Sequence, residues 1–324
     1  MGDIAMTVPV LAAFSKAHPT IRITVLTKKQ FAPLFRDLQM VTVILADFTA
    51  THKGVYGLYK LSKQIRNTSV DAVADLHNVL RTKILSVFLL GLNFVQMDKG
   101  RSEKKALISG NLHVPLRTTT QRYADVFRRL GFDFDLDNPS FPEAKQLDAT
   151  VLSQLGQLSK PVIGIAPFAA YASKTYPLSK MEKVIFELQK ENKVLLFGGG
   201  LNETNLLKKI ASKFPNVYCV AGTFDLDQEL DIISNLKVML SMDSSNGHMA
   251  AMLGVSVVTL WGVTHPFAGF APFGQLDRNN LLSDLNKYPQ IPTSIYGNKY
   301  PEGYALAIET IPVKMIVKTV KANL

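Results

Sequence analysis

Short apolar runs rich in β-branched residues alternate with helical patterns along the chain, and this alternation constrains the fold more than any other feature. In the first half, such runs predict strands at residues 21–26, 42–46, 71–76 and 94–97. Between them, apolar residues repeating every three to four positions predict helices at residues 4–16, 56–66, 82–90 and 122–130. Strands that alternate with helices are typical of parallel βαβ units.

A second series follows a stretch rich in Asp, Asn and Pro at residues 132–142. Its predicted strands are residues 162–166, 193–197, 217–220, 238–241 and 255–260. Its predicted helices are residues 148–158, 179–191, 203–213, 226–235 and 246–253. A chain of 324 residues is too long for one ordinary core. The sequence therefore predicts two Rossmann-like α/β domains, at residues 1–147 and 148–324.

Composition narrows the class of protein. Apolar residues make up 47% of the chain and charged residues 19%, which excludes a disordered chain. The single cysteine, Cys219, excludes an internal disulfide and a cysteine-based metal site, and it favours a reducing compartment. The N-terminus shows no signal-peptide pattern, and the longest apolar stretch, residues 84–92, is about half of a membrane span. We expect a soluble or peripherally attached cytoplasmic protein.

The positive charge lies mainly in the first half. Residues 1–147 carry 20 Lys and Arg against 12 Asp and Glu, a net charge of +8, out of +10 for the whole chain. This excess indicates an anionic partner or surface. Nucleic acid is not expected, because the chain has no arginine-rich arm, zinc-finger spacing or aromatic-basic motif.

A loop of small polar residues connects a predicted strand to a predicted helix at residues 241–254. Ser244, Ser245 and Gly247 leave backbone N–H groups uncovered where the helix dipole favours an anion. His248 follows in the first turn and can donate to a phosphate oxygen. Asp243 repels a phosphate unless its carboxylate is already engaged, for example as a helix cap. The alternative is an ordinary capped helix with a surface histidine.

Two further loops follow predicted strands of the second series. The first, residues 167–177, leads to Lys174, which suits a diphosphate as a movable point charge or is simply a solvated lysine. The second carries three glycines and then Glu203, where a dinucleotide-binding fingerprint needs glycine. The Glu203 carboxylate suits ribose hydroxyls, or it stabilises the start of a helix.

The chain opens on Gly2 and Asp3, which resemble a strand-to-helix turn with no strand before it. We therefore expect an uncovered position in the first sheet, and a kink at Pro9 in the helix that follows. Asp3 is a candidate general base for an attacking hydroxyl, or an N-cap residue.

A basic run at residues 99–105 follows the last predicted strand of the first series. Arg101, Lys104 and Lys105 are candidates for binding an anionic acceptor, or they form a solvated face. The histidines show no metal-ligand spacing, so no metal site is expected.

Taken together, these segments resemble glycosyltransferase family 9, the ADP-heptose:lipopolysaccharide heptosyltransferases. The resemblance rests on GDIAMTVPVL, QRYA, GIAPFA with SKTYP, FGGGLNE, and MDSSNGHMAAMLGVSVVTLWGVTHP, in this order. It implies a GT-B fold, in which the first of two facing domains binds the acceptor and the second binds a nucleotide sugar. It also implies inverting transfer without a metal or a cofactor, from a donor expected to be ADP-heptose. The implied acceptor is an anionic glycolipid of the lipopolysaccharide core, reached by peripheral contact with the inner face of the inner membrane.

The resemblance also implies a role for each matching residue. Asp3 matches the general base, Lys174 the lysine at the donor phosphates, and Glu203 the glutamate at the ribose. The residues that match the diphosphate and donor-sugar loop are Asp243, Ser244, Ser245, Gly247 and His248. The chain departs from the family where the first strand is absent and where the phosphate loop reads Ser-Ser-Asn-Gly. A sugar-nucleotide epimerase and a non-catalytic nucleotide- or glycan-binding module are the alternatives.

Overall fold

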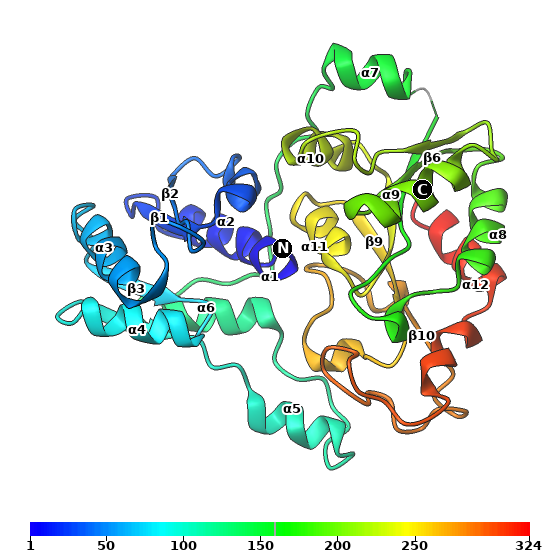
Figure 1. Cartoon of the computed structure of the whole chain (residues 1–324). Helices are drawn as coiled ribbons and strands as arrows, with labels where there is room; N and C mark the ends of the chain where they lie inside the picture. Colours follow the sequence, from blue (N-terminus) through cyan, green and yellow to red (C-terminus); the bar gives the residue numbers. More distant parts are fainter. Residues whose placement is uncertain (159) are drawn as a thin grey trace. The chain divides into compact units, whose positions relative to one another are not determined.

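The structure is a computed structural model that describes residues 1–158 and 160–324 and divides them into two compact units (Figure 1). The C-terminal unit comprises Met1–Met6, Ser102–Leu116 and Phe141–Leu324, and the N-terminal unit comprises Thr7–Arg101 and Arg117–Ser140. This division differs from the single predicted boundary at residue 147. The first residues group with the C-terminal unit because Gly2 packs on His248, and residues 102–116 do so because Leu107 and Leu116 pack with Ala268.

The C-terminal unit contains a six-stranded parallel sheet in the order β10-β9-β8-β5-β6-β7. The strands are β5 (Val162–Ala166), β6 (Lys193–Leu196), β7 (Val217–Cys219), β8 (Val238–Met242), β9 (Ser256–Trp261) and β10 (Asn280–Leu282). The helices are α1 (Gly2–Ala5), α5 (Arg101–Ile108), α7 (Ala149–Leu155), α8 (Leu178–Leu188), α9 (Gly200–Ala211), α10 (Leu226–Ser234), α11 (Ser245–Met252) and α12 (Val313–Lys321). Short 3₁₀ segments are η2 (Ala172–Lys174), η3 (Pro266–Ala268), η4 (Asp277–Asn279) and η5 (Tyr304–Thr310). The five strands predicted for this region are confirmed.

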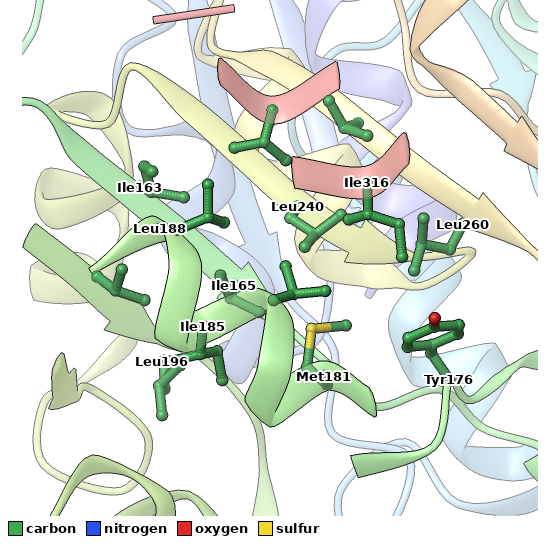
Figure 2. Close-up of a cluster of buried hydrophobic side chains, with 14 of the residues drawn as sticks. Ile163, Ile165, Tyr176, Met181, Ile185, Leu188, Leu196, Leu240, Leu260 and Ile316 are labelled. Atoms are coloured by element: carbon green, nitrogen blue, oxygen red, sulfur yellow. The ribbon is translucent and has the colours of Figure 1, made fainter. Parts of the chain in front are cut away.

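Both faces of this sheet are buried, as the continuous apolar character of its strands requires. One face packs against α8, α9 and α12, and Figure 2 shows Met181, Ile185 and Ile316 in this cluster beside residues of the sheet. On the other face, an added Cβ on Gly164 of β5 would lie 2.5 Å from Leu236, so the segment just after α10 lies against the strand. This packing fixes the carboxyl ends of the strands, where the loops predicted to bind ligand begin.

The N-terminal unit contains two separate pairs of parallel strands, β1-β2 and β3-β4. Its strands are β1 (Ile23–Thr27), β2 (Val41–Leu45), β3 (Ala72–Asp75) and β4 (Asn93–Gln96). Its helices are α2 (Thr7–Ala17), η1 (Lys29–Phe35), α3 (Gly54–Arg66), α4 (Leu80–Phe88) and α6 (Thr119–Arg129). One apolar cluster, which includes Leu26, Ile44, Val73 and Phe94, joins both pairs to α3 and α4. Within the described residues, β1 and β3 do not pair with each other.

Three features differ from the predicted elements. The single helix predicted at residues 4–16 is divided at Met6 into α1 and α2. Pro9 then falls in the first turn of α2, where its missing N–H would have no helical partner in any case. The chain therefore starts a new helix before Pro9, and no helix is kinked at this residue. The alternation also does not predict α5, β10 or α12. In the described part of the chain, no helix is long and apolar enough to cross a membrane.

Candidate functional site

The loops that carry the candidate residues leave the same edge of the C-terminal sheet. Parallel strands end at one edge, so the loops after β8, β5, β6 and β7 lie next to one another in that order. The order of strands reverses between β5 and β8: the chain runs outward from β5 to β6 and β7, and from β8 to β9 and β10 in the other direction. Ligands of open α/β sheets bind at such a switch point.

A cavity of about 620 Å³ lies at this edge, a volume typical of small-ligand sites. All of its lining residues belong to the C-terminal unit. They are Met1, Phe168, Ala169, Ala170, Lys174, Gly198, Gly199, Glu203, Gly222, Phe224, Leu226, Glu229, Asp243, Ser244, Ser245, Asn246 and Met249. The structure therefore brings Lys174, Glu203, Asp243, Ser244 and Ser245 together at this cavity, whereas Gly247 and His248 are not among its lining residues.

Lys174 and Asp243 form a buried ion pair in this cavity. The Lys174 Nζ donates to Asp243 Oδ2 over 2.9 Å, and the two side chains are 10% and 11% exposed. The Thr264 hydroxyl donates to the same oxygen over 3.0 Å. Asp243 is thus engaged by Lys174 and Thr264 and does not cap α11, whose first turn receives no side-chain cap. The pair is neutral overall, and the ammonium group retains N–H donors for a further anion.

Two glycines fit the backbone around Lys174. At Gly262 an added Cβ would lie 2.0 Å from the Ser173 carbonyl oxygen, and at Gly297 it would lie 2.7 Å from Lys174 Cγ. Gly297 also has φ of +84°, in the left-handed region that favours glycine. The buried Ser173 hydroxyl donates to the Gly297 carbonyl over 2.5 Å. These contacts hold the lysine stem in one direction, toward Asp243.

The start of α11 presents polar atoms without a partner. The side-chain oxygens Ser241 Oγ and Ser244 Oγ and the ring nitrogen His248 Nδ1 are buried and have no hydrogen-bond partner among the described residues. Gly247 allows this helix to approach β8, since an added Cβ would lie 2.5 Å from Ser241 Oγ. The backbone N–H groups of the first turn are unpaired within a helix by geometry. This end of α11 is therefore equipped to donate hydrogen bonds to an anion.

His248 connects α11 to the opening residues of the chain. An added Cβ on Gly2 would lie 3.0 Å from His248 Cδ2, so α1 lies directly on the ring. Burial lowers the pKa of His248 below its ordinary value, and this exceeds the opposite effect of the Asp243 and Asp3 carboxylates. The imidazole is therefore neutral near pH 7. The carboxylate of the exposed Asp3 lies close enough to raise the pKa of the His248 ring, in opposition to burial.

Glu203 serves the helix that contains it as well as the cavity. Its Oε2 accepts the Gly199 N–H over 2.8 Å, at the N-cap of α9. The helix-stabilising interpretation and the ligand-binding interpretation therefore both fit this residue, because the carboxylate also lines the cavity.

The basic run forms the start of α5. The Lys104 ammonium lies 4.3 Å from the centroid of the Phe270 ring, a cation–π contact. Arg101 and Lys105 are exposed, and Arg101 belongs to the N-terminal unit. Acceptor binding by these three residues stays a prediction. Separately, the described residues contain no group of three or more His, Cys, Asp or Glu side chains arranged to hold a metal ion.

Sequence reasoning did not assign Thr264, the glycines at 262 and 297, or Glu229. Thr264 follows the Trp-Gly of a predicted strand end, which is the one signal that pointed toward it. Glu229 and Phe224 line the cavity from α10 and the loop before it. No local pattern marked them.

Comparison with known proteins gives one consistent family. The model of glycosyltransferase family 9 (heptosyltransferase) matches residues 58–298. The lipopolysaccharide core heptosyltransferase OpsX of Haemophilus influenzae is 25% identical over 295 residues, which cover 87% of this chain and 81% of that protein.

Solved structures of this kind are similar over the whole chain. A family 9 glycosyltransferase from Veillonella parvula matches with a TM-score of 0.77 at 18% identity, covering 99% of this chain and 94% of the other. The E. coli heptosyltransferase WaaC with ADP matches with a TM-score of 0.69 at 17% identity, covering 100% and 97%. These similarities confirm the predicted α/β fold of the GT-B class.

Proposed function

The chain belongs to glycosyltransferase family 9, and from this premise we propose that it transfers heptose from ADP-heptose to a lipopolysaccharide-core or related anionic glycolipid. The observation that carries the proposal is the cavity in which the Lys174–Asp243 pair and the uncapped start of α11 converge. Family membership favours glycosyl transfer over the epimerase and the non-catalytic binding module. ADP is the bound nucleotide in the similar WaaC structure, which supports adenine as the donor base.

We propose that transfer inverts the anomeric carbon in a single displacement of ADP by the acceptor hydroxyl. The acceptor hydroxyl oxygen forms a bond to the anomeric carbon on the face opposite the diphosphate. The bond from that carbon to the diphosphate oxygen breaks, and its electron pair leaves with ADP. Asp3 accepts the proton of the hydroxyl as general base.

The leaving diphosphate gains negative charge in the transition state. Lys174, the first-turn N–H groups of α11 and the neutral His248 are the donors we assign to it. Preorganised donors of this kind contribute about 3–4 kcal/mol each to transition-state stabilisation. Because these groups take up the phosphate charge, we propose that transfer needs no metal.

The direct test of the nucleotide site is a thermal-shift panel of ADP, GDP, UDP and CDP. ADP at a hundred times its Kd stabilises the protein by about 2.7 kcal/mol, and the other three should give clearly smaller shifts. A donor-only incubation serves as the control, because a transferase releases little free sugar without an acceptor. Equal shifts for all four nucleotides, or none, contradict the proposal.

We propose that peripheral membrane contact uses a surface that we call the α3–α4 surface. It combines apolar side chains that are 40–75% exposed with a set of cations. The apolar residues are Val55, Tyr56, Tyr59, Leu80, Val87 and Leu90. The cations are Lys60, Lys63, Arg66, Arg81 and Lys83, and the sequences of α3 and α4 contain no Asp or Glu. Apolar side chains among cations are typical of surfaces that bind anionic lipid.

We expect the protein to sediment with vesicles containing phosphatidylglycerol and not with vesicles of phosphatidylcholine alone. Replacing Tyr56, Val87 and Leu90 together by Ser should weaken this binding by about tenfold or more, because the exposed apolar area is lost. Leu306→Ser is the matched control, since Leu306 is 58% exposed but belongs to the C-terminal unit. Equal binding of the triple variant and the wild type would show that another surface contacts lipid.

A further inference from the structure

Glu229 is a carboxyl group in the cavity to which the proposed function gives no role. It lies in the first turns of α10, is half-buried, and lines the cavity beside Phe224 and Leu226. No described residue donates a hydrogen bond to its carboxyl group. Burial raises the pKa of this carboxyl to about 7, and the neighbouring Asp225 carboxylate adds to the rise. A half-buried acid without a partner in a binding cavity is a candidate ligand contact.

The order of the loops gives the direction in which a nucleotide lies. The proposed phosphate contacts follow β8 and β5, and Glu203 follows β6. Gly222, Phe224 and Glu229 come after β7, the strand at the far end of this series. Three strand intervals of about 4.8 Å separate β8 from β7, about 14 Å in all. A nucleoside diphosphate held by its phosphates at β8 therefore places its base beside Glu229.

We propose that Glu229 binds the base of the donor as the neutral acid, donating its O–H to adenine N1 and accepting a hydrogen bond from the N6 amino group. The inference rests on the proposed function. It adds the residue that contacts the base and makes nucleotide binding proton-linked. Phe224 and Leu226 supply apolar surface on the same side of the cavity.

Protonation decides which base edge this carboxyl matches. The neutral acid offers one donor and one acceptor side by side, as adenine N1 and N6 require. The ionised form only accepts, so it repels the N1 lone pair but matches the adjacent N1–H and N2 amino donors of guanine. Uracil also offers one donor and one acceptor side by side, so the hydrogen-bond pattern does not separate it from adenine. The larger size of the purine does, because it extends the base edge further toward Glu229.

Other ionisable groups at the cavity differ in their environment. Lys174 and Asp243 are paired, and Glu203 accepts a backbone N–H. Met1 also lines the cavity. A variant that removes only the Glu229 titration is therefore needed to isolate its effect. Glu229→Gln is that variant, because the amide presents one donor and one acceptor at every pH.

The experiment is calorimetric titration of the full chain with ADP and GDP at pH 6.0 and 8.5, for wild type and Glu229→Gln. With a carboxyl pKa of about 7, the protonated fraction falls about 30-fold over this range, so ADP binding to the wild type should weaken by up to about 30-fold relative to the variant. The ratio of ADP to GDP affinity should fall with pH in the wild type and stay constant in Glu229→Gln. The ionisation of the ADP phosphate is common to both proteins and cancels.

Proton uptake by the same two proteins gives a second readout. In buffers of different ionisation enthalpy at pH 8, ADP binding to the wild type should take up close to one proton, since most Glu229 is ionised before binding. ADP binding with identical pH profiles in both proteins, and no uptake beyond that of the variant, overturns the role of Glu229 alone. Absence of binding by every nucleoside diphosphate to the wild type overturns the proposed function as well.

Discussion

Asp3→Asn is expected to lower kcat for sugar transfer by about 10²- to 10⁴-fold while leaving the Kd for ADP within a factor of about 3. The amide has nearly the shape of the carboxylate but accepts no proton, so the acceptor hydroxyl loses its general base. Asp3 is exposed, and its replacement removes no buried group. We therefore expect little change in the free energy of unfolding.

The measurements are transfer rate, ADP affinity and thermal stability on the same preparations. Asp277→Asn is the matched control, because Asp277 is also an exposed aspartate at the start of a short helix of the C-terminal unit but is not among the carboxylates that act on His248. It should alter none of the three quantities. Loss of transfer together with loss of ADP binding would make Asp3 a structural residue. Undiminished transfer would assign the base elsewhere.

Asp3 also illustrates how far local sequence could predict this site. Its position after Gly2 at the start of a helix fits a cap as well as a base. The structure adds that Gly2 packs on His248 and that the Asp3 carboxylate raises the pKa of that ring, in opposition to burial. Asp3 and His248 are separated by about three quarters of the chain, so no local pattern could predict that α1 would lie on α11. Local chemistry left the general base and the N-cap open for Asp3, and the resemblance favoured the general base.

The elements of the sheet were easier to predict than their partners. Strands buried on both faces are continuous apolar runs, and the bounds of β5 coincide with the prediction at residues 162–166. The three-residue β10 is too short to stand out, and α12 is rich in β-branched residues that lower helix propensity. The charged start of α5 resembles a solvated face, although Leu107 is buried. In each case tertiary packing outweighs local preference.

The sequence predicted which residue types the loops carry, but not which of these residues contact one another. Small residues after strands predicted a ligand-binding edge of the sheet, and the structure places most of the candidate residues around one cavity there. The contact between Lys174 and Asp243 joins residues 69 positions apart. Glu229 stayed unnoticed because α10 carries an ordinary capping box from Asp225 and Gln228, which accounts for the polar residues of its first turn. Its function depends on where the helix lies.

The second large effect is expected for Lys174→Ala, which should lower the free energy of unfolding by about 3–5 kcal/mol. The substitution leaves the Asp243 carboxylate 11% exposed, with only the Thr264 hydroxyl still donating to it. A buried charge that loses its partner retains its desolvation cost. Chemical denaturation measures the change. Lys180→Ala is the matched control, because the Lys180–Glu309 pair is 35% exposed on both sides and should contribute only about 0–1 kcal/mol.

The same variant separates the phosphate role of Lys174 from its structural role. ADP should bind about 10- to 100-fold more weakly, whereas adenosine, which carries no phosphate, should lose much less affinity. Equal losses for the two ligands would remove the phosphate assignment. Adding Asp243→Asn to Lys174→Ala should recover part of the stability, since it removes the unpaired charge, but it should not restore ADP binding. Recovery of both would mean that Lys174 acts on the nucleotide only by neutralising Asp243.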